Sequence, residues 1–390
     1  MTGGTAGLPQ FTWAEVCTRR LERHSLLAPA PNAQPAAVVG TICGAHAQVL
    51  SAAELSIALR LPTATRTDIR AALWTARSLV KTFGPRGTVH ILPTRDLPLW
   101  TGALSALPSA PSPFSADILL SPEQTDTLVA AIGEVLDDAE LTVDELTEAL
   151  IARVGPWAGE LVMPAFQTLW PRWRQITDTA AHRGALCFGP NRGRKVTYTS
   201  PRRWLPGFQP ADGQTALVEL LKRYLYAYGP ATPPHFAQWL AMPRPWAVAL
   251  FESLADELQE VEVAGNRAWI VAGDTAMPSV AAPSLRLLPY FDAYAVGAHP
   301  RDRVYPGRAG TRALAGGQSG NFPVLLVDGV VAGVWHQRRS GRKLALTVEP
   351  LAPLNAAQRH QLEAEATRIG DILEGTPELT SGTVTVGPHA

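Results

Sequence analysis

The sequence predicts an α+β protein in which three winged helix-turn-helix units precede a small C-terminal β-barrel. Three segments repeat the order helix, turn, amphipathic helix and β-hairpin, and from about Ser284 the pattern changes to short strands. A chain of 390 residues also exceeds the usual size of one compact domain. We place the units at 1–110, 111–212, 213–282 and 283–390.

The first unit is predicted from two helix starts and one strand. Ser51 and Glu54 have the spacing of a capping box, which indicates a helix that begins there. Thr67 is a candidate cap for a second helix over 68–80, whose apolar residues recur at helical spacing. The β-branched segment 87–93 then predicts a strand of the wing.

The second unit begins with Thr142 and Glu145, another capping box. We expect the helix that follows it to be succeeded by a helix around Pro164–Ala181. The unit ends at 185–200, where two strand-like segments flank a basic, Gly-rich turn and predict a hairpin.

The third unit has the clearest signals. Thr232 and Pro233 suit the cap and first turn of a helix, and 245–258 has the pattern of a second helix. A hairpin follows over 258–271, for which Gly265-Asn266 is the predicted turn.

The C-terminal unit combines strands with one long helix. Short strand-like segments lie within 285–297, 323–336 and 343–351, as in a small barrel or sheet. Between them, 300–321 is rich in Gly and Arg and predicts a long mobile loop or hairpin. An amphipathic helix over 356–373 is expected to pack on the barrel.

Composition places the chain among ordinary soluble globular proteins, with 46% hydrophobic and 17% charged residues. Cys17, Cys43 and Cys187 are too few and too far apart for a disulfide framework or a cysteine zinc site, which fits a reducing cytoplasm. We expect no cofactor, no metal, no export signal and no membrane span.

Charge is segregated along the chain although the formal net charge is zero. Only four of the 34 cationic residues are Lys, and Arg suits phosphate groups and base edges. A GC-rich genome would equally favour Arg, and winged helices also serve as protein-binding scaffolds. The acidic block spans 134–148, and the basic clusters contain Arg183, Arg192, Arg194, Lys195, Arg202, Arg203, Arg308, Arg312, Arg338, Arg339, Arg342 and Lys343.

Five segments in order resemble the AlkZ-like (YcaQ-like) winged-helix DNA glycosylases. The resemblance extends from about Phe11 to Gly375 and is carried by GAHAQVLSAAELSIALR, RGTVHILP, RYLYAYGPATPPHFAQWL, LRLLPYFDAYAVGAHPRDR and GVVAGVW. It implies three tandem winged helices and a β-barrel in a C-shape around duplex DNA. It also implies excision of N7- or N3-alkylated purines, including bulky adducts and crosslinks left by DNA-alkylating natural products.

The family's catalytic motif is Q-x-Q or Q-x-D, and the resemblance places it here at His46, Ala47 and Gln48. His46 departs from the usual Gln, and an H-x-Q variant is associated with the branch that protects antibiotic producers from their own products. An N7-alkylated purine is already cationic, so it can leave without an acid catalyst. Gln48 could then orient a water molecule, while neutral His46 accepts its proton.

The spacing of these two residues favours a non-helical backbone. Residues i and i+2 lie on one face of an extended segment but on different faces of a helix, so we expect the motif at a helix end or turn. Asp292 is a possible second catalytic carboxylate, although a residue that caps a turn is the more ordinary interpretation. We assign Trp239 and Trp335 to the core.

The expected partner is double-stranded DNA that contains alkylated purines, bound by a monomer. The candidate DNA contacts are arginines of the C-terminal unit. The basic turn at 192–195 is a second choice. The rival functions are a winged-helix transcription regulator and a non-catalytic protein that binds damaged DNA. The arginines of the C-terminal unit that we predict to contact DNA are Arg301, Arg303, Arg308, Arg312, Arg338, Arg339 and Arg342.

Overall fold

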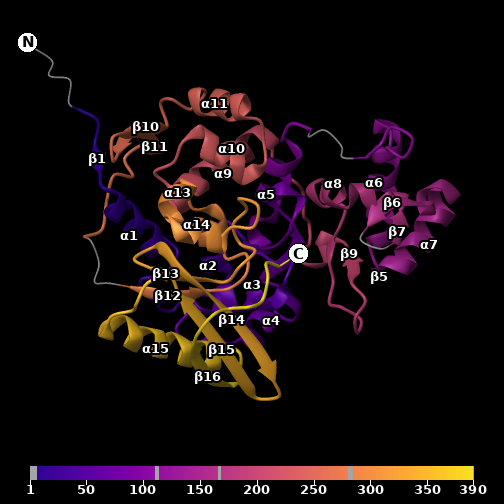
Figure 1. Cartoon of the computed structure of the whole chain (residues 1–390). Helices are drawn as coiled ribbons and strands as arrows, with labels where there is room; N and C mark the ends of the chain where they lie inside the picture. Colours follow the sequence, from indigo (N-terminus) through magenta and orange to yellow (C-terminus); the bar gives the residue numbers. More distant parts are fainter. Residues whose placement is uncertain (1–6, 110–113, 166–167, 280–283, 390) are drawn as a thin grey trace, which may run out of the picture. The chain divides into compact units, whose positions relative to one another are not determined.

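The computed structural model describes residues 7–109, 114–165, 168–279 and 284–389. It divides into two compact units, of which unit 1 comprises 1–70 and 221–390 and unit 2 comprises 71–220 (Figure 1). Both contain helices and mainly antiparallel strands, so the predicted α+β class is confirmed. The predicted boundaries at 110/111 and 282/283 lie outside the described residues, and the number of winged helices stays a prediction.

The N-terminal part of unit 1 is helical because its apolar side chains recur on one face. In α1 (Trp13–Arg23), Thr12 and Glu15 form a capping box, and Val16 and Leu21 are buried. The next two helices and the short strand between them are α2 (Pro35–Thr41), β2 (Ala45–His46) and α3 (Leu50–Ala58).

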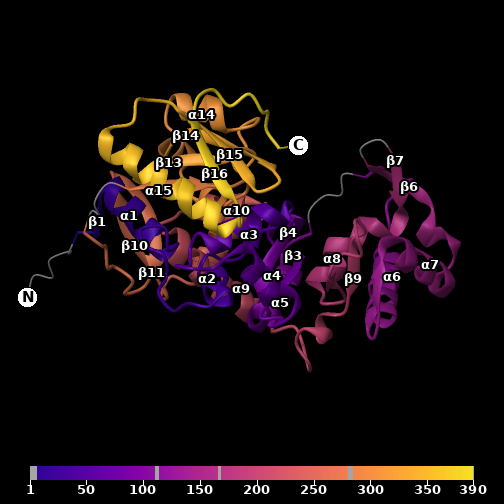
Figure 2. The same ribbon diagram turned by 90° about the horizontal axis from the view of Figure 1, so that it is seen from below.

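A curled sheet of five strands forms the C-terminal half of unit 1. The strand order is β12-β13-β14-β15-β16, and every pair is antiparallel except β15 and β16. That parallel pair needs a crossover, which α15 (Ala356–Ile372) supplies. Its contacts extend to both edge strands, β12 and β16. Figure 2 shows α15 lying beside β16. The strands are β12 (Leu285–Leu288), β13 (Val324–Val327), β14 (Val330–Ser340), β15 (Lys343–Pro350) and β16 (Thr376–Ser381).

The third predicted unit has the expected order of helices and hairpin. Thr232 caps α10 with Pro233 in the first turn, as predicted. The hairpin turn is Ala264-Gly265, one residue earlier than predicted, and both residues have positive φ. The elements are α9 (Gly213–Tyr228), which spans the unit boundary, α10 (Pro233–Leu240), α11 (Arg244–Glu252), β10 (Leu258–Val263) and β11 (Asn266–Val271), with β1 (Gln10–Phe11) parallel to β10.

Unit 2 contains a helical core and three small hairpin pairings. Its Thr142–Glu145 capping box is confirmed, and so is the hairpin within 185–200. Buried Leu128, Leu146 and Trp173 belong to its hydrophobic core. The elements are α5 (Leu97–Ser105), α6 (Pro122–Leu136), α7 (Val143–Val154), α8 (Thr177–His182), β3 (Leu79–Phe83), β4 (Val89–Pro93), β5 (Glu140–Thr142), β6 (Leu161–Ala165), β7 (Thr168–Pro171), β8 (Cys187–Phe188) and β9 (Thr197–Thr199).

Two predicted helix starts are wrong. The cap of α3 is Val49, and Glu54 is buried in an ion pair with Arg70, so Ser51 and Glu54 form no capping box. In α4 (Arg66–Trp74), which also spans the unit boundary, the hydroxyl that faces Asp68 belongs to Thr65. The sequence spacing was suitable in both places, but Glu54 pairs with Arg70 and the Thr67 hydroxyl donates to Glu374 at 3.0 Å.

Three predicted segments also differ from the structure. The helix over 68–80 stops at Trp74, because 79–83 form β3 and pair with β4. The first part of the predicted helix around Pro164–Ala181 is instead the β6-β7 hairpin, and among the described residues of that range only those of α8 are α-helical. The predicted loop 300–321 contains two short helices, α13 (Arg301–Val304) and α14 (Arg308–Ala313), anchored by the buried side chains of Val304, Ala309 and Ala313.

Candidate active site and nucleic-acid interface

The His46-Ala47-Gln48 segment is non-helical and directly precedes α3, as predicted. Cys43 and Gly44, both with positive φ, turn the chain out of α2 and into β2. The His46 side chain is buried, with 7% of the residue exposed, whereas Gln48 is exposed. The motif therefore presents one side chain to solvent and holds the other within unit 1.

The ring of His46 stacks on the ring of Phe291. Their centroids are 4.6 Å apart, and the ring planes differ by 22°. Phe291 has a φ of 55°, an uncommon conformation for a residue with a side chain, and its amide donates to the carbonyl of Gly320 at 2.9 Å. The stacking contact restricts the imidazole ring of His46, because the backbone conformation and hydrogen bond of Phe291 hold the partner ring in place.

Asp292, the next residue, is completely engaged by protein groups. Nη1 and Nη2 of Arg60 each donate to one carboxylate oxygen at 2.8 Å, and the Ser56 hydroxyl donates at 2.6 Å. The backbone amide of Tyr294 donates at 2.9 Å, so Asp292 caps α12 (Ala293–Gly297). We call Ser56, Arg60 and Asp292 the clamp. Its geometry is that of a structural cap and ion pair.

The electrostatics of the clamp keep Asp292 ionised. Burial by itself raises the pKa of this carboxyl, but the Arg60 guanidinium and the hydrogen bonds from Ser56 and Tyr294 outweigh it and lower the pKa below its ordinary value. Ser56 lies on α3, and Arg60 follows it, so the clamp joins the helix after Gln48 to the residue after Phe291. The clamp therefore links, through buried contacts, the chain segments that carry the two stacked rings of His46 and Phe291.

A second histidine, His24, is buried beside the clamp but has a different character. Its ring meets Tyr228 and Tyr294 edge-on at centroid distances of 4.9 and 5.4 Å. Burial, reinforced by the charge of Arg60, lowers the pKa of His24 to about 3. This imidazole is therefore neutral at physiological pH and packs as an aromatic core residue.

Four of the seven predicted DNA-contacting arginines donate to the protein itself. Arg301 donates to the carbonyls of Ala295, Val296 and Ala298, at the end of α12. Arg312 binds Glu349 through two hydrogen bonds of 2.9 Å. Arg339 donates to three carbonyls, including that of Leu373 at 2.7 Å, whereas exposed Arg308 has one long hydrogen bond of 3.3 Å.

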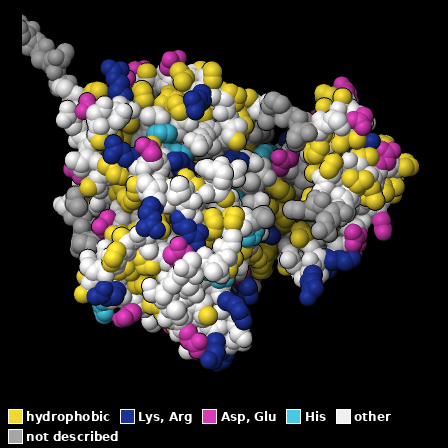
Figure 3. Space-filling view, viewed as in Figure 1, with side chains coloured by type: hydrophobic (Ala, Val, Ile, Leu, Met, Phe, Trp, Pro, Cys, Tyr) yellow, Lys and Arg dark blue, Asp and Glu magenta, His cyan; other side chains and the backbone are white. Residues whose placement is uncertain are grey.

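The other three, Arg303, Arg338 and Arg342, are exposed. In the described part of the chain their side chains make no hydrogen bond or ion pair with the protein, and we call these residues the free arginines. Arg338 and Arg342 lie near the tip of the β14-β15 hairpin, where Figure 3 shows basic side chains gathered at the bottom of the view. These side chains can reach a phosphate without breaking an existing contact.

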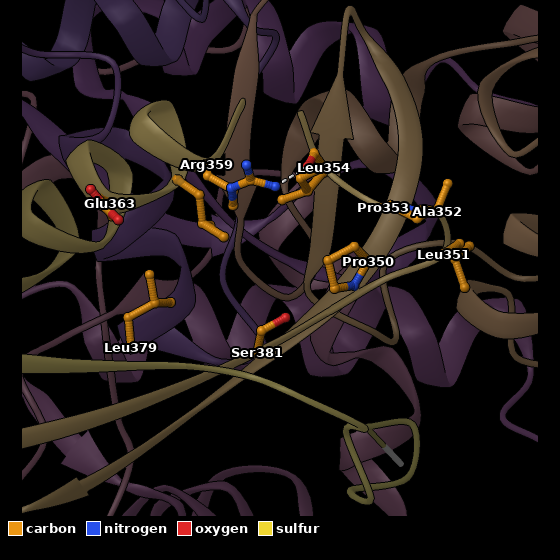
Figure 4. Close-up of a pocket in the computed structure, with 10 residues that line it drawn as sticks. Pro350, Leu351, Ala352, Pro353, Leu354, Arg359, Glu363, Leu379 and Ser381 are labelled. Carbon is orange, nitrogen blue, oxygen red and sulfur yellow. Dashed lines mark hydrogen bonds between the residues drawn. The ribbon is translucent and has the colours of Figure 1, made fainter. Parts of the chain in front are cut away.

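A cavity of about 600 Å³ lies beside α15 and the segment that follows β15 (Figure 4). Pro350, Leu354 and Leu379 form part of its wall, and Arg359 donates to the carbonyl of Leu354 at 2.6 Å. None of the predicted catalytic residues lines it. Among the described residues, no group of three His, Cys, Asp or Glu side chains could hold a metal ion.

Comparison with known proteins identifies the family. The family model described as DNA glycosylase AlkZ-like matches residues 39–372. The chain belongs to the AlkZ-like DNA glycosylase family. This AlkZ-like chain is 33% identical over 337 residues to an interstrand DNA cross-link repair glycosylase of Streptomyces sahachiroi, with 83% of the chain and 87% of the relative covered.

The structural comparison agrees with the family assignment. The solved structure of Streptomyces sahachiroi DNA glycosylase AlkZ matches with a TM-score of 0.80 and 28% identity, covering 96% of this chain and 100% of that one. The AlkZ-like protein described here thus shares the mixed α+β fold of a DNA repair enzyme. Within its described residues, no helix is both long and apolar enough to cross a bilayer.

Sequence reasoning missed the partners of the predicted site. Phe291 lies in the quoted segment LRLLPYFDAYAVGAHPRDR, but nothing in its spacing indicates that it stacks on His46. Ser56 and Arg60 are more than 230 positions from Asp292, and a single sequence carries no signal for that pairing. The capping role of Asp292 and the non-helical backbone of the His46 segment are the local features that the sequence could show.

Proposed function

We propose that this protein hydrolyses the N-glycosidic bond of N7- or N3-alkylated purines in duplex DNA, including bulky adducts and crosslinks. The observation that carries the proposal is the non-helical His46-Ala47-Gln48 segment before α3, in a chain of the AlkZ-like family. The inclusion of bulky adducts and crosslinks among the substrates is supported by the relative that is named an interstrand DNA cross-link repair glycosylase. Excision of such adducts would also protect an organism that produces a DNA-alkylating compound from its own product.

The reaction we propose needs no acid catalyst. Alkylation at N7 places a positive charge on the purine, so the electrons of the C1′–N9 bond leave with a base that becomes neutral. Water attacks C1′, the amide of Gln48 orients that water, and His46 in its neutral form accepts the proton. Asp292 already receives four hydrogen bonds, so we assign it to positioning of the site.

The decisive assay uses a purified duplex that carries a single N7-alkylguanine. We expect abasic sites, detected as alkaline strand cleavage, with simple and bulky adducts under single-turnover conditions. An undamaged duplex of the same sequence is the control. A winged-helix regulator or a non-catalytic damage-binding protein would bind DNA without strand cleavage, and that result with every adduct would exclude our proposal.

The free arginines are the proposed backbone contacts, and two of them share one hairpin. We expect Arg338→Ala combined with Arg342→Ala to weaken binding to all duplex sequences similarly. The slope of log Kd against log salt should fall by about 2, because each lost phosphate contact removes about 0.9. Fluorescence anisotropy at several salt concentrations measures this slope.

The control for this pair is Arg359→Ala, which removes an exposed arginine of α15. That variant should keep the wild-type salt slope. An unchanged slope in the double variant would show that the hairpin tip does not bind the DNA backbone.

A further inference from the structure

Two half-buried aromatic residues adjoin the His46 stack. Tyr290 and Phe291 follow β12, and their ring centroids are 6.4 Å apart with a 40° angle between the planes. We call this pair the aromatic shelf. Because Phe291 also stacks on His46, the shelf extends from the proposed catalytic histidine toward solvent.

The C-terminal tail of the chain lies against this shelf. The exposed ring of His389 meets Tyr290 at 5.4 Å and Phe291 at 5.4 Å, with interplanar angles of 63° and 78°. Its backbone amide donates to the carbonyl of Asn321 at 2.8 Å. The plane of the imidazole is therefore steeply inclined to both rings and is not stacked parallel to either of them.

The tail is anchored at Val384 and again at His389, and the residues between these two points are loosely held. Val384 is buried, its amide donates to Glu349 at 2.7 Å, and its carbonyl accepts from Arg312 at 2.7 Å. Residues 385–388 are exposed, and the described structure shows no backbone hydrogen bond for them. Displacement of His389 would break its backbone hydrogen bond to Asn321 and its ring contacts, while the tail would stay attached at Val384.

We propose that the aromatic shelf is a stacking subsite for a planar aromatic group carried by the DNA lesion, and that His389 is the built-in occupant displaced by that group. A flat polycyclic substituent that lies parallel to either ring covers more of that ring than a steeply inclined imidazole does, so it competes for the shelf. The subsite rests on the proposed function, because its position beside His46 has meaning only if the lesion is bound there.

The test compares two bulky lesions of similar size but different shape. Duplexes carry either N7-(2-naphthylmethyl)guanine or the same adduct with the naphthyl group fully hydrogenated and puckered. A 2′-fluorine on the damaged sugar blocks excision, so anisotropy measures binding without catalysis. We expect wild-type protein to prefer the planar adduct. We expect His389→Ala to bind it about threefold to tenfold more tightly, with little change for the puckered one.

A second variant removes the shelf instead of its occupant. Tyr290→Leu keeps apolar bulk but should abolish the preference for the planar adduct. His360→Ala, which removes an exposed histidine from α15, is the control and should bind both duplexes as wild type does. A chain terminated after Thr385 should reproduce His389→Ala, because both lack the imidazole on the shelf.

The outcomes separate this inference from the proposed function. Equal affinity of the wild-type protein for the two shapes, unchanged in Tyr290→Leu and His389→Ala, would overturn the subsite even if every unfluorinated adduct is excised. Weaker planar binding in His389→Ala would also overturn it, since the imidazole would then assist the ligand. Absence of excision with a persistent planar preference would reject the glycosylase proposal and leave the subsite standing.

Discussion

Gln48→Ala and His46→Ala are each expected to slow single-turnover excision of N7-alkylguanine by about 10²- to 10⁴-fold while duplex affinity stays unchanged. General-base catalysis contributes an effect of that size, and a water molecule that is not oriented loses a comparable advantage. The affinity is retained because the proposed phosphate contacts lie on the free arginines. Quenched-flow or manual sampling with alkaline cleavage measures the rate, and anisotropy measures the affinity.

A conservative variant separates chemistry from packing at the same position. His46→Gln introduces the Gln that the family motif usually has at this position, so this variant should retain more activity than His46→Ala. Gln318→Ala removes another exposed glutamine and is the matched control for Gln48. If both alanine variants excise at the wild-type rate, His46 and Gln48 are not the catalytic pair.

Asp292→Ala is expected to destabilise unit 1 by about 3–5 kcal/mol, the cost of leaving a buried charge without its partner. Both side chains of the ion pair have 0% exposure, so the Arg60 guanidinium would have no water to replace the carboxylate. Chemical denaturation followed by fluorescence would show the shift in the transition that belongs to unit 1.

Two further variants test this explanation. Arg60→Met combined with Asp292→Leu removes both charges and should recover much of the lost stability. Glu374→Ala removes one partner of a solvent-exposed pair with Arg66 and should cost less than about 1 kcal/mol. A folded Asp292→Asn protein that loses excision as severely as His46→Ala would instead indicate that this carboxylate is catalytic.

Local signals in the sequence predicted much of the fold. Thr142 with Glu145, and Thr232 with Pro233, mark helix starts correctly because a cap acts within one turn of the helix. The helix over 356–373 agrees with α15 to within one residue. Trp239 and Trp335 are buried, with 5% and 1% exposure, as their apolar positions indicated.

The errors arise where distant partners decide the outcome. Residues 79 and 80 continue a helical pattern, yet they pair with β4 because a strand gains backbone hydrogen bonds from its neighbour. Arg312 was predicted to contact DNA, and the structure shows it bound to Glu349, 37 positions away in sequence; its contact with DNA stays a prediction. The predicted catalytic residues could be placed locally, whereas their stacking and clamp contacts depend on segments far away in sequence.

The discontinuity of unit 1 affects the order in which the chain can fold during synthesis. Unit 2 is contiguous, so all of its residues emerge from the ribosome before the second half of unit 1 exists. The His46 segment cannot form its contacts until then, because Phe291 and Asp292 are made about 245 residues later. The parallel strand β16 comes later still. A nascent chain therefore acquires its proposed catalytic geometry only after all of unit 2 and the segment with Phe291 and Asp292 have emerged from the ribosome.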